Sequence, residues 1–137
     1  MTRGIFPKLA SAKAAVAIVA TAITLPLAAQ SVGLEMLQGL SRGEWTIKYR
    51  NGSMDEKICV RTGEELIQLR HNGSTCDRFV VEDVATKVTV QYTRPGDGYG
   101  RTNIRRETNS LVQLESQGIS SGEPFQFSAE ARLSGTC

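Results

Sequence analysis

Residues 125–133 read FQFSAEARL, and this stretch decides the fold class. Its apolar residues alternate with polar ones; they are Phe125, Phe127, Ala129, Ala131 and Leu133. Successive side chains of a β-strand point to opposite faces of a sheet, so strict alternation predicts a strand with one buried face and one solvated face. The sequence therefore predicts a protein built mainly from β-strands.

The same two-residue period recurs earlier in the chain. From Glu44 to Arg50, Trp45, Ile47 and Tyr49 alternate with polar residues, and Asn51-Gly52 then favours a hairpin turn. Further strands are predicted at residues 57–60, 76–82, 84–93, 101–107 and 111–117. Six to seven one-faced strands joined by short turns predict an antiparallel meander, curled into a half-barrel or a small barrel.

The hairpin between strands 101–107 and 111–117 allows a prediction of register. A three-residue loop at 108–110 places Ile104 opposite Leu114, and also Arg105 opposite Gln113 and Asn103 opposite Glu115. A two-residue loop would move Ile104 opposite Glu115. Because a slip of one residue turns every side chain to the other face, we predict the three-residue loop.

One short helix is expected among the strands, at residues 63–70 and packed at one end of the sheet. Thr62 and Glu65 have the spacing of a capping box, and Asn72-Gly73 ends the segment. His71 follows the helix and is interpreted as a residue that compensates the helix dipole. Leucines at three-residue spacing between residues 32 and 40 indicate one or two further helical turns.

The first 29 residues have the layout of a secretory leader. Arg3, Lys8 and Lys13 precede an uncharged run, residues 14–29, which ends in small residues. We expect cleavage after Ala29, with Ser31 as the alternative, and a single periplasmic domain over residues 30–137. The other reading is an uncleaved membrane anchor, but the run is shorter than the roughly 20 apolar residues of a bilayer span.

The charge of the expected mature domain argues against a nucleic-acid partner. The full chain has 16 basic and 14 acidic residues, and the leader removes three basic residues and no acidic ones, which leaves 13 and 14. Such a domain has no bulk positive charge to attract nucleic acid or anionic lipid.

Three cysteines remain after the leader in what should be an oxidising compartment. Cys59 and Cys76 flank the expected helix, so a bridge between them would close it against the sheet and leave Cys137 as a free thiol. The two pairings that use Cys137 are the alternatives. A monomer is expected, with a Cys137-linked dimer as the other outcome.

Catalytic and cofactor motifs are weak. The spacing of Cys59, His71, Cys76 and Asp77 fits no standard zinc pattern, so no metal is expected. The loop at residues 95–100 is rich in glycine but lacks the following helix that a phosphate site needs, so no cofactor is expected. With one histidine and no nucleophile coupled to it, the chain is predicted not to be an enzyme.

Several motifs resemble the DUF3617 family of small exported bacterial proteins of unknown function. They are Gly43-Glu44-Trp45, Ile58-Cys59-Val60 before a short helix, Cys76 after it, and the Ala131-Arg132, Gly135 and Cys137 ending. The resemblance implies export and a β-rich fold, and it supplies no catalytic or binding residues. Relatives tend to have a fourth cysteine where Arg94 stands here, so the resemblance favours a free thiol at Cys137.

Two functional hypotheses follow. The first is a non-enzymatic periplasmic protein that binds a small apolar ligand or an envelope component. Its candidate ligand-facing residues are the aromatics Trp45, Tyr49, Tyr92, Phe125 and Phe127, which equally well form a filled core. The second is a protein-interaction module, such as an inhibitor of an envelope hydrolase, with Tyr99 at the tip of the glycine-rich loop as the partner-facing residue.

Overall fold

The computed structural model describes Gly4, residues 33–73 and residues 75–137. The chain divides into two units, Met1–Gln30 and Ser31–Cys137, and the description below concerns the second. Apart from Gly4, the predicted leader and its cleavage site lie outside the described residues. Within the described ranges, no helix has the length and apolar character needed to cross a membrane.

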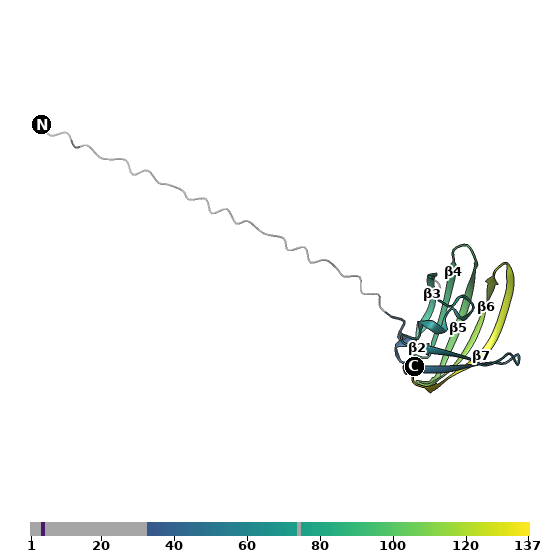
Figure 1. Ribbon diagram of the computed structural model, residues 1–137. Coiled ribbons are helices and arrows are strands. Elements are labelled where there is room, and N and C mark those ends of the chain that lie inside the picture. The colour runs from purple at the N-terminus through teal and green to yellow at the C-terminus, as the bar shows by residue number, and fades with distance from the viewer. Residues whose placement is uncertain (1–3, 5–32, 74) are drawn as a thin grey trace. The chain divides into compact units, whose positions relative to one another are not determined.

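The described residues form one antiparallel sheet of seven strands, in the order β2-β1-β7-β6-β5-β4-β3 (Figure 1). The strands are β1 (Gly43–Tyr49), β2 (Glu56–Val60), β3 (Asp77–Val84), β4 (Lys87–Arg94), β5 (Gly98–Thr108), β6 (Leu111–Ser120) and β7 (Glu123–Gly135). The prediction of a mainly β, antiparallel fold is confirmed. Because β2 and β3 are opposite edges of the order, the sheet is an open half-barrel and not a closed barrel.

The strand order departs from a simple meander in one respect. Strands β3 to β7 follow chain order, but the β1–β2 hairpin lies beyond β7. Strand β1 pairs with β7 through Ile47 and Ala131, and with β2 through Trp45 and Ile58. The last strand of the chain therefore lies between the first hairpin and the rest of the sheet.

The inner face of the sheet packs against short helical segments to form the core. These segments are α1 (Glu35–Gln38), η1 (Glu64–Leu66) and η2 (Leu69–His71). They contribute Met36, Leu37, Leu66 and Leu69 to the core, and Ile67 joins them from the link between η1 and η2. The strands contribute Trp45, Ile47, Val60, Val88, Val90, Tyr92, Ile104, Val112, Leu114, Phe127, Ala129 and Ala131. The two-residue period thus predicted the buried faces of β1, β4, β5, β6 and β7, as the pleat requires, whereas no residue of β3 is buried.

The helix predicted at residues 63–70 is two 3-10 turns instead, and this part of the prediction is wrong. The capping contacts do form, since the Glu65 carboxylate accepts backbone N–H groups of Arg61 at 3.0 Å and Gly63 at 2.9 Å. The backbone leaves helical geometry at Gln68, with φ −124° and ψ 49°, which separates η1 from η2. The helical turns expected between residues 32 and 40 are present as α1.

The predicted register of the β5–β6 hairpin is confirmed, with Ile104 opposite Leu114. The loop is shorter than predicted, because Thr108 already pairs with Leu111 and leaves a two-residue turn. A bulge between Arg106 and Thr108 restores the expected register. The apolar face therefore decided the pairing, and the strand absorbed the extra residue.

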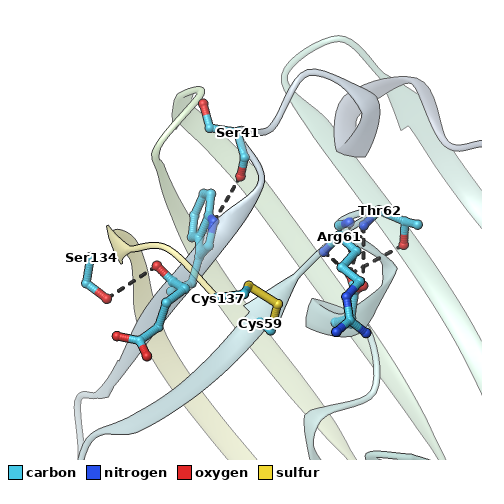
Figure 2. The surroundings of a disulfide bond; sticks show 10 residues. Ser41, Cys59, Arg61, Thr62, Ser134 and Cys137 are labelled. Carbon is cyan, nitrogen blue, oxygen red and sulfur yellow. Dashed lines mark hydrogen bonds between the residues drawn. A yellow bond between two sulfur atoms is a disulfide. The ribbon is translucent and has the colours of Figure 1, made fainter.

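The disulfide joins Cys59 to Cys137, with the two Cα atoms 5.5 Å apart, so the predicted Cys59–Cys76 bridge is wrong (Figure 2). Glu44 on β1 lies opposite Cys59 on one side and Gly135 on the other, which brings the end of the chain to Cys59. Cys76 precedes β3 at the opposite edge of the sheet and is a half-buried free thiol. The Cys137-linked dimer and the free thiol at Cys137 are therefore also ruled out.

Candidate functional site

The five aromatic residues predicted to face a ligand pack largely among themselves and the core. Trp45, Tyr92 and Phe127 are buried, and Tyr49 and Phe125 are half-buried. The rings of Tyr49 and Phe127 meet edge-on with centroids 5.3 Å apart, and Phe125 stacks on Phe127 at 6.2 Å. These contacts are those of a filled interior.

Two polar groups complete this aromatic cluster. The Arg70 guanidinium carbon lies 5.4 Å from the centroid of the Phe127 ring, within the range of a cation–π contact. The Tyr49 hydroxyl donates to the Glu56 carboxylate at 2.7 Å. Burial of the ring, followed by that hydrogen bond, raises the pKa of Tyr49 well above its ordinary value.

A buried polar network connects η2 to the turn between β4 and β5. The His71 side chain is fully buried, with Nδ1 at 3.0 Å from the Tyr92 hydroxyl and Nε2 at 3.0 Å from Oδ2 of Asp97. The Nε2 contact has the distance of an ion pair but not the alignment of a hydrogen bond. The interpretation of His71 as a dipole-compensating residue is therefore wrong, because its ring is buried in the core, where it contacts Tyr92 and Asp97.

Asp97 extends this network to a second turn. Its Oδ1 accepts from the Ser121 N–H at 2.9 Å and from the Ser121 hydroxyl at 3.1 Å. Desolvation raises the pKa of Asp97, but the hydrogen bonds from Ser121 and the charges of Arg94 and His71 outweigh it, so the net pKa is lowered. The β4–β5 and β6–β7 turns are thereby fixed to each other and to η2.

Tyr92 is the other end of this network. Burial raises its pKa to about 12, and the nearby Cys76 sulfur acts in the same direction. Gly100 lies directly across from Tyr92 in the β4–β5 ladder, and a Cβ at that position would overlap the phenol ring. The observed position of the Tyr92 ring therefore requires glycine at position 100.

The opposite, outer face of the sheet carries a row of polar side chains. Ladder pairing places Gln91, Arg101, Gln117 and Gln126 side by side across strands β4 to β7, with Phe79 of β3 at the end of the row. Two adjoining hollows of about 300 and 550 Å³ share Arg101, Gln117 and Gln126. We call these two hollows together the outer trough.

The two parts of the outer trough differ in character. The smaller hollow adds the polar residues Asn103, Glu115 and Ser128. The larger hollow adds Tyr99, Pro124 and Phe125 among others, so it is the less polar part. A ligand in the trough would thus meet hydrogen-bonding groups at one end and the exposed Tyr99 ring at the other, because the Phe125 ring packs on the inner face.

Several polar side chains of the outer trough make no hydrogen bond or ion pair with other described residues. Within residues 33–73 and 75–137, the side chains of Arg101, Glu115, Gln117 and Gln126 make no hydrogen bond or ion pair with the protein. Just outside the trough the pattern changes, since Gln113 accepts from Arg50 at 2.5 Å. The trough therefore presents free donors and acceptors at fixed positions on a rigid sheet.

Tyr99 is exposed, as predicted, but it does not sit at a loop tip. It is the second residue of β5, is 55% exposed and lines the larger hollow. The turn before it is short, because β4 ends at Arg94 and β5 begins at Gly98. Tyr99 thus belongs to the same surface as Arg101 on the same strand.

Sequence reasoning did not single out the outer trough. Its residues are the polar half of each alternating strand, which is ordinarily a solvated face. Only the ladder register brings Arg101, Gln117 and Gln126 together.

Among the described residues, no group of three or more histidine, cysteine, aspartate or glutamate side chains is arranged to hold a metal ion.

Comparison of the chain with family models, curated proteins and solved structures finds no match. The resemblance to the DUF3617 family therefore stays a prediction.

Proposed function

We propose that this protein is an exported, non-enzymatic binding protein that holds an oligosaccharide of the cell envelope in the outer trough. The observation that supports this most directly is the set of uncommitted polar side chains, Arg101, Glu115, Gln117 and Gln126, which share one hollow surface. Small-ligand sites typically combine a concave surface with a few convergent polar groups.

The chemistry of the trough suits a chain of hydroxyl groups. Each sugar hydroxyl both donates and accepts, and the amides of Gln117 and Gln126 do the same. Arg101 adds donors only, and Glu115 adds acceptors only, so neighbouring hydroxyls of one sugar find both kinds of partner. An anionic or cationic ligand would instead be expected to meet several charges of one sign.

Tyr99 supplies an apolar surface at the other part of the trough. Its ring is 55% exposed, and an exposed phenol offers an aromatic face with a polar tip. The face of a pyranose ring that carries C–H groups can lie against such a surface. The open form of the trough on a sheet suits a chain of sugars better than a single enclosed ring.

Binding without hydrolysis is the role that the residues favour. Hydrolysis of a glycosidic bond ordinarily uses a pair of carboxyl groups on either side of the bond. Among the described residues that line the two hollows, Glu115 is the one carboxylate. The trough therefore offers contacts for binding and lacks the usual second carboxyl group.

Export is the remaining part of the proposal. The predicted leader motivates it, and the Cys59–Cys137 disulfide is compatible with an oxidising compartment. An exported protein of this kind would encounter the glycans of the envelope directly.

Calorimetric titration with peptidoglycan glycan strands, from which the peptides have been removed, tests the proposal. We expect saturable binding by the protein, and a loss of affinity of about tenfold in Arg101→Ala or Gln117→Ala, in line with one lost hydrogen bond to a charged or neutral group. Lys48→Ala is the control, since Lys48 is exposed on β1 outside the trough. No heat of binding, or equal losses in all three variants, would contradict the proposal.

The exposure of Tyr99 also favours a second candidate, a protein-interaction module. In that case Tyr99→Ala would abolish capture of a periplasmic partner, while neither the parent nor Arg101→Ala would bind glycan strands. If the outer trough binds glycan, Tyr99→Ala and Arg101→Ala should weaken the same titration.

A further inference from the structure

The open end of the β1–β2 hairpin, away from its loop, forms a hollow that is separate from the outer trough. The hollow has a volume of about 620 Å³ and shares no lining residue with either part of the trough. Residues 33–42, around α1, form one wall, and residues 61–64, after β2, form the other. Small-ligand sites have volumes of about 300–1,000 Å³. We call this feature the hairpin hollow.

Two arginines line the hairpin hollow, one from each wall. Gly43 begins β1 and pairs with Val60, which ends β2. The next residue outward is an arginine on both segments, Arg42 before β1 and Arg61 after β2, and both are exposed. The ladder register therefore brings two positive charges to one hollow, and like charges at neighbouring cross-strand positions repel each other.

These two charges are not compensated within residues 33–73 and 75–137. The side chains of Arg42 and Arg61 make no hydrogen bond or ion pair with that part of the chain. Each guanidinium group carries five N–H donors that suit the oxygens of a carboxylate or a phosphate. The hollow thus offers two unpaired cationic groups to a ligand.

The acidic side chains of this region do not neutralise the arginines. Glu64, which also lines the hollow, contacts Arg78 at 2.6 Å. The Glu65 carboxylate accepts backbone N–H groups of residues 61 and 63, and Glu44 pairs with a lysine of β2 at 3.1 Å. Glu35 of α1 is exposed and is not part of the lining. The charge that remains free in the hollow is positive, so the hollow favours an anion.

The hairpin hollow also has an apolar surface. Leu34, Leu37 and Leu40 line it, and Leu34 is half-buried whereas the other two are buried. A leucine side chain forms no hydrogen bond, so an inorganic anion would leave this surface in contact with water. An alkyl chain would cover it, and the burial of apolar surface is favourable. The two kinds of surface together suit a ligand with an anionic part and an apolar part.

We infer that the hairpin hollow binds a small anionic amphiphile, in which a carboxylate or phosphate head group is joined to an alkyl chain. The head group lies between Arg42 and Arg61 and compensates both charges through charge-assisted hydrogen bonds. The alkyl chain lies on the leucine surface. This inference does not rest on the proposed binding of glycan, because the two sites have no residue in common.

The ligand is a single dissolved molecule and not a lipid within a bilayer. The expected mature domain has 13 basic and 14 acidic residues, as counted above from the full chain. Such a domain lacks the bulk positive charge that would hold it at an anionic membrane surface. The two arginines of the hollow are a local site for one head group.

Calorimetric titration of the purified protein with decanoate, kept below its micelle concentration, tests the inference. We expect saturable binding that weakens as salt is added, because salt screens exposed charges. Arg42→Gln and Arg61→Gln should each raise the dissociation constant about tenfold, as for the loss of a hydrogen bond to a charged group. Neither change should lower the midpoint of thermal unfolding, since each removes one of two neighbouring like charges.

Arg132→Gln is the matched control. Arg132 is also exposed, but it lies on β7 outside the hairpin hollow, so this variant should bind decanoate as the parent does. Inorganic phosphate and decanol each lack one part of the proposed ligand. Each should bind the parent about tenfold more weakly than decanoate, or weaker still.

The fluorescence of Trp45 locates the bound ligand. Trp45 is the single tryptophan of the chain, and its indole N–H donates to the Ser41 carbonyl at 3.0 Å, next to Arg42 in the sequence. Bromine quenches tryptophan fluorescence at short range. Decanoate brominated on its alkyl chain should therefore quench Trp45, and it should quench less in Arg61→Gln at the same ligand concentration.

Several results would overturn the inference. They are the absence of saturable decanoate binding, equal affinity for decanol, equal affinity in the parent and both arginine variants, and binding that leaves Trp45 unquenched. Binding to phosphatidylglycerol vesicles without binding to free decanoate would also overturn it, because the hollow would then recognise a membrane surface. Since these measurements contain no glycan, their failure would leave the proposed function of the outer trough untouched.

Discussion

His71 and Asp97 lie 3.0 Å apart, Nε2 to Oδ2, although they are 26 positions apart in the sequence and the histidine is fully buried. The other ring nitrogen of His71 meets the Tyr92 hydroxyl at 3.0 Å. This chain of contacts fixes η2 and the β4–β5 turn at the end of the sheet where Tyr99 lines the outer trough. The buried network thus supports the surface that we propose for binding.

Removal of the Tyr92 hydroxyl should destabilise the protein. Tyr92→Phe leaves Nδ1 of His71 buried without its partner, and an unsatisfied buried polar group costs about 1–3 kcal/mol. Urea unfolding measures the loss. Tyr49→Phe is the control, because the Tyr49 hydroxyl bonds to Glu56 in a half-buried place where water can replace it, and it should cost less. Equal losses in both variants would contradict a special role for the His71 contact.

Acid should remove the stabilisation that Glu65 provides. Burial raises the pKa of Glu65, but hydrogen bonds to its carboxylate from its own backbone N–H and from those of residues 61–63 together lower it by more. The contribution of Glu65 is therefore fully present above the ordinary pKa of a glutamate and is lost as the pH falls through the lower, folded pKa. The free energy of unfolding of Glu65→Gln should accordingly depend less on pH below about 5 than that of the parent. Identical pH profiles for the two proteins would argue against this cause.

Reduction of the disulfide should lower stability substantially. The bridge spans 78 positions, and the chain-entropy model gives about 4.5 kcal/mol for a loop of that size. Cys59→Ser should lower the free energy of unfolding by an amount of that order, whereas Cys76→Ser should preserve the bridge. Peptide mapping without reductant should recover a fragment that joins Cys59 to Cys137. Recovery of a fragment that joins Cys59 to Cys76 would show that the sheet order places the C-terminus incorrectly.

A methyl group at position 100 should disturb Tyr92. Gly100→Ala places a Cβ against the Tyr92 phenol ring, so the ring or the β5 backbone must shift. We expect a loss of about 1–3 kcal/mol, as for other overpacked sites, measured by urea unfolding. A neutral result would mean that the ring can move out at little cost.

The fold was predictable because a local pattern determines it. The alternation at Trp45 and Ile47, and again at Phe127 and Ala129, requires only that the strand be half-buried, and all four residues are in the core. The pairing of Ile104 with Leu114 followed from the same rule applied to two neighbouring strands.

The disulfide and the outer trough were not predictable in this way. The bridge from Cys59 to Cys137 depends on β1 lying between β2 and β7, which no local pattern near either cysteine indicates. The trough depends on Arg101 and Gln117 meeting across a ladder, although each alone resembles any solvated residue. The place of His71 was missed for a related reason, since its partner Tyr92 lies on a strand and not in the adjacent helical turn.

The most direct test of the binding proposal is to map the amide chemical-shift changes of the isotope-labelled protein during titration with peptide-free glycan strands. We predict shifts that are concentrated on Gln91, Tyr99, Arg101, Gln117 and Gln126, with little change at Trp45 on the inner face. Shifts confined to the inner aromatic residues, or no shifts at saturating glycan, would contradict a glycan-binding role for the outer trough.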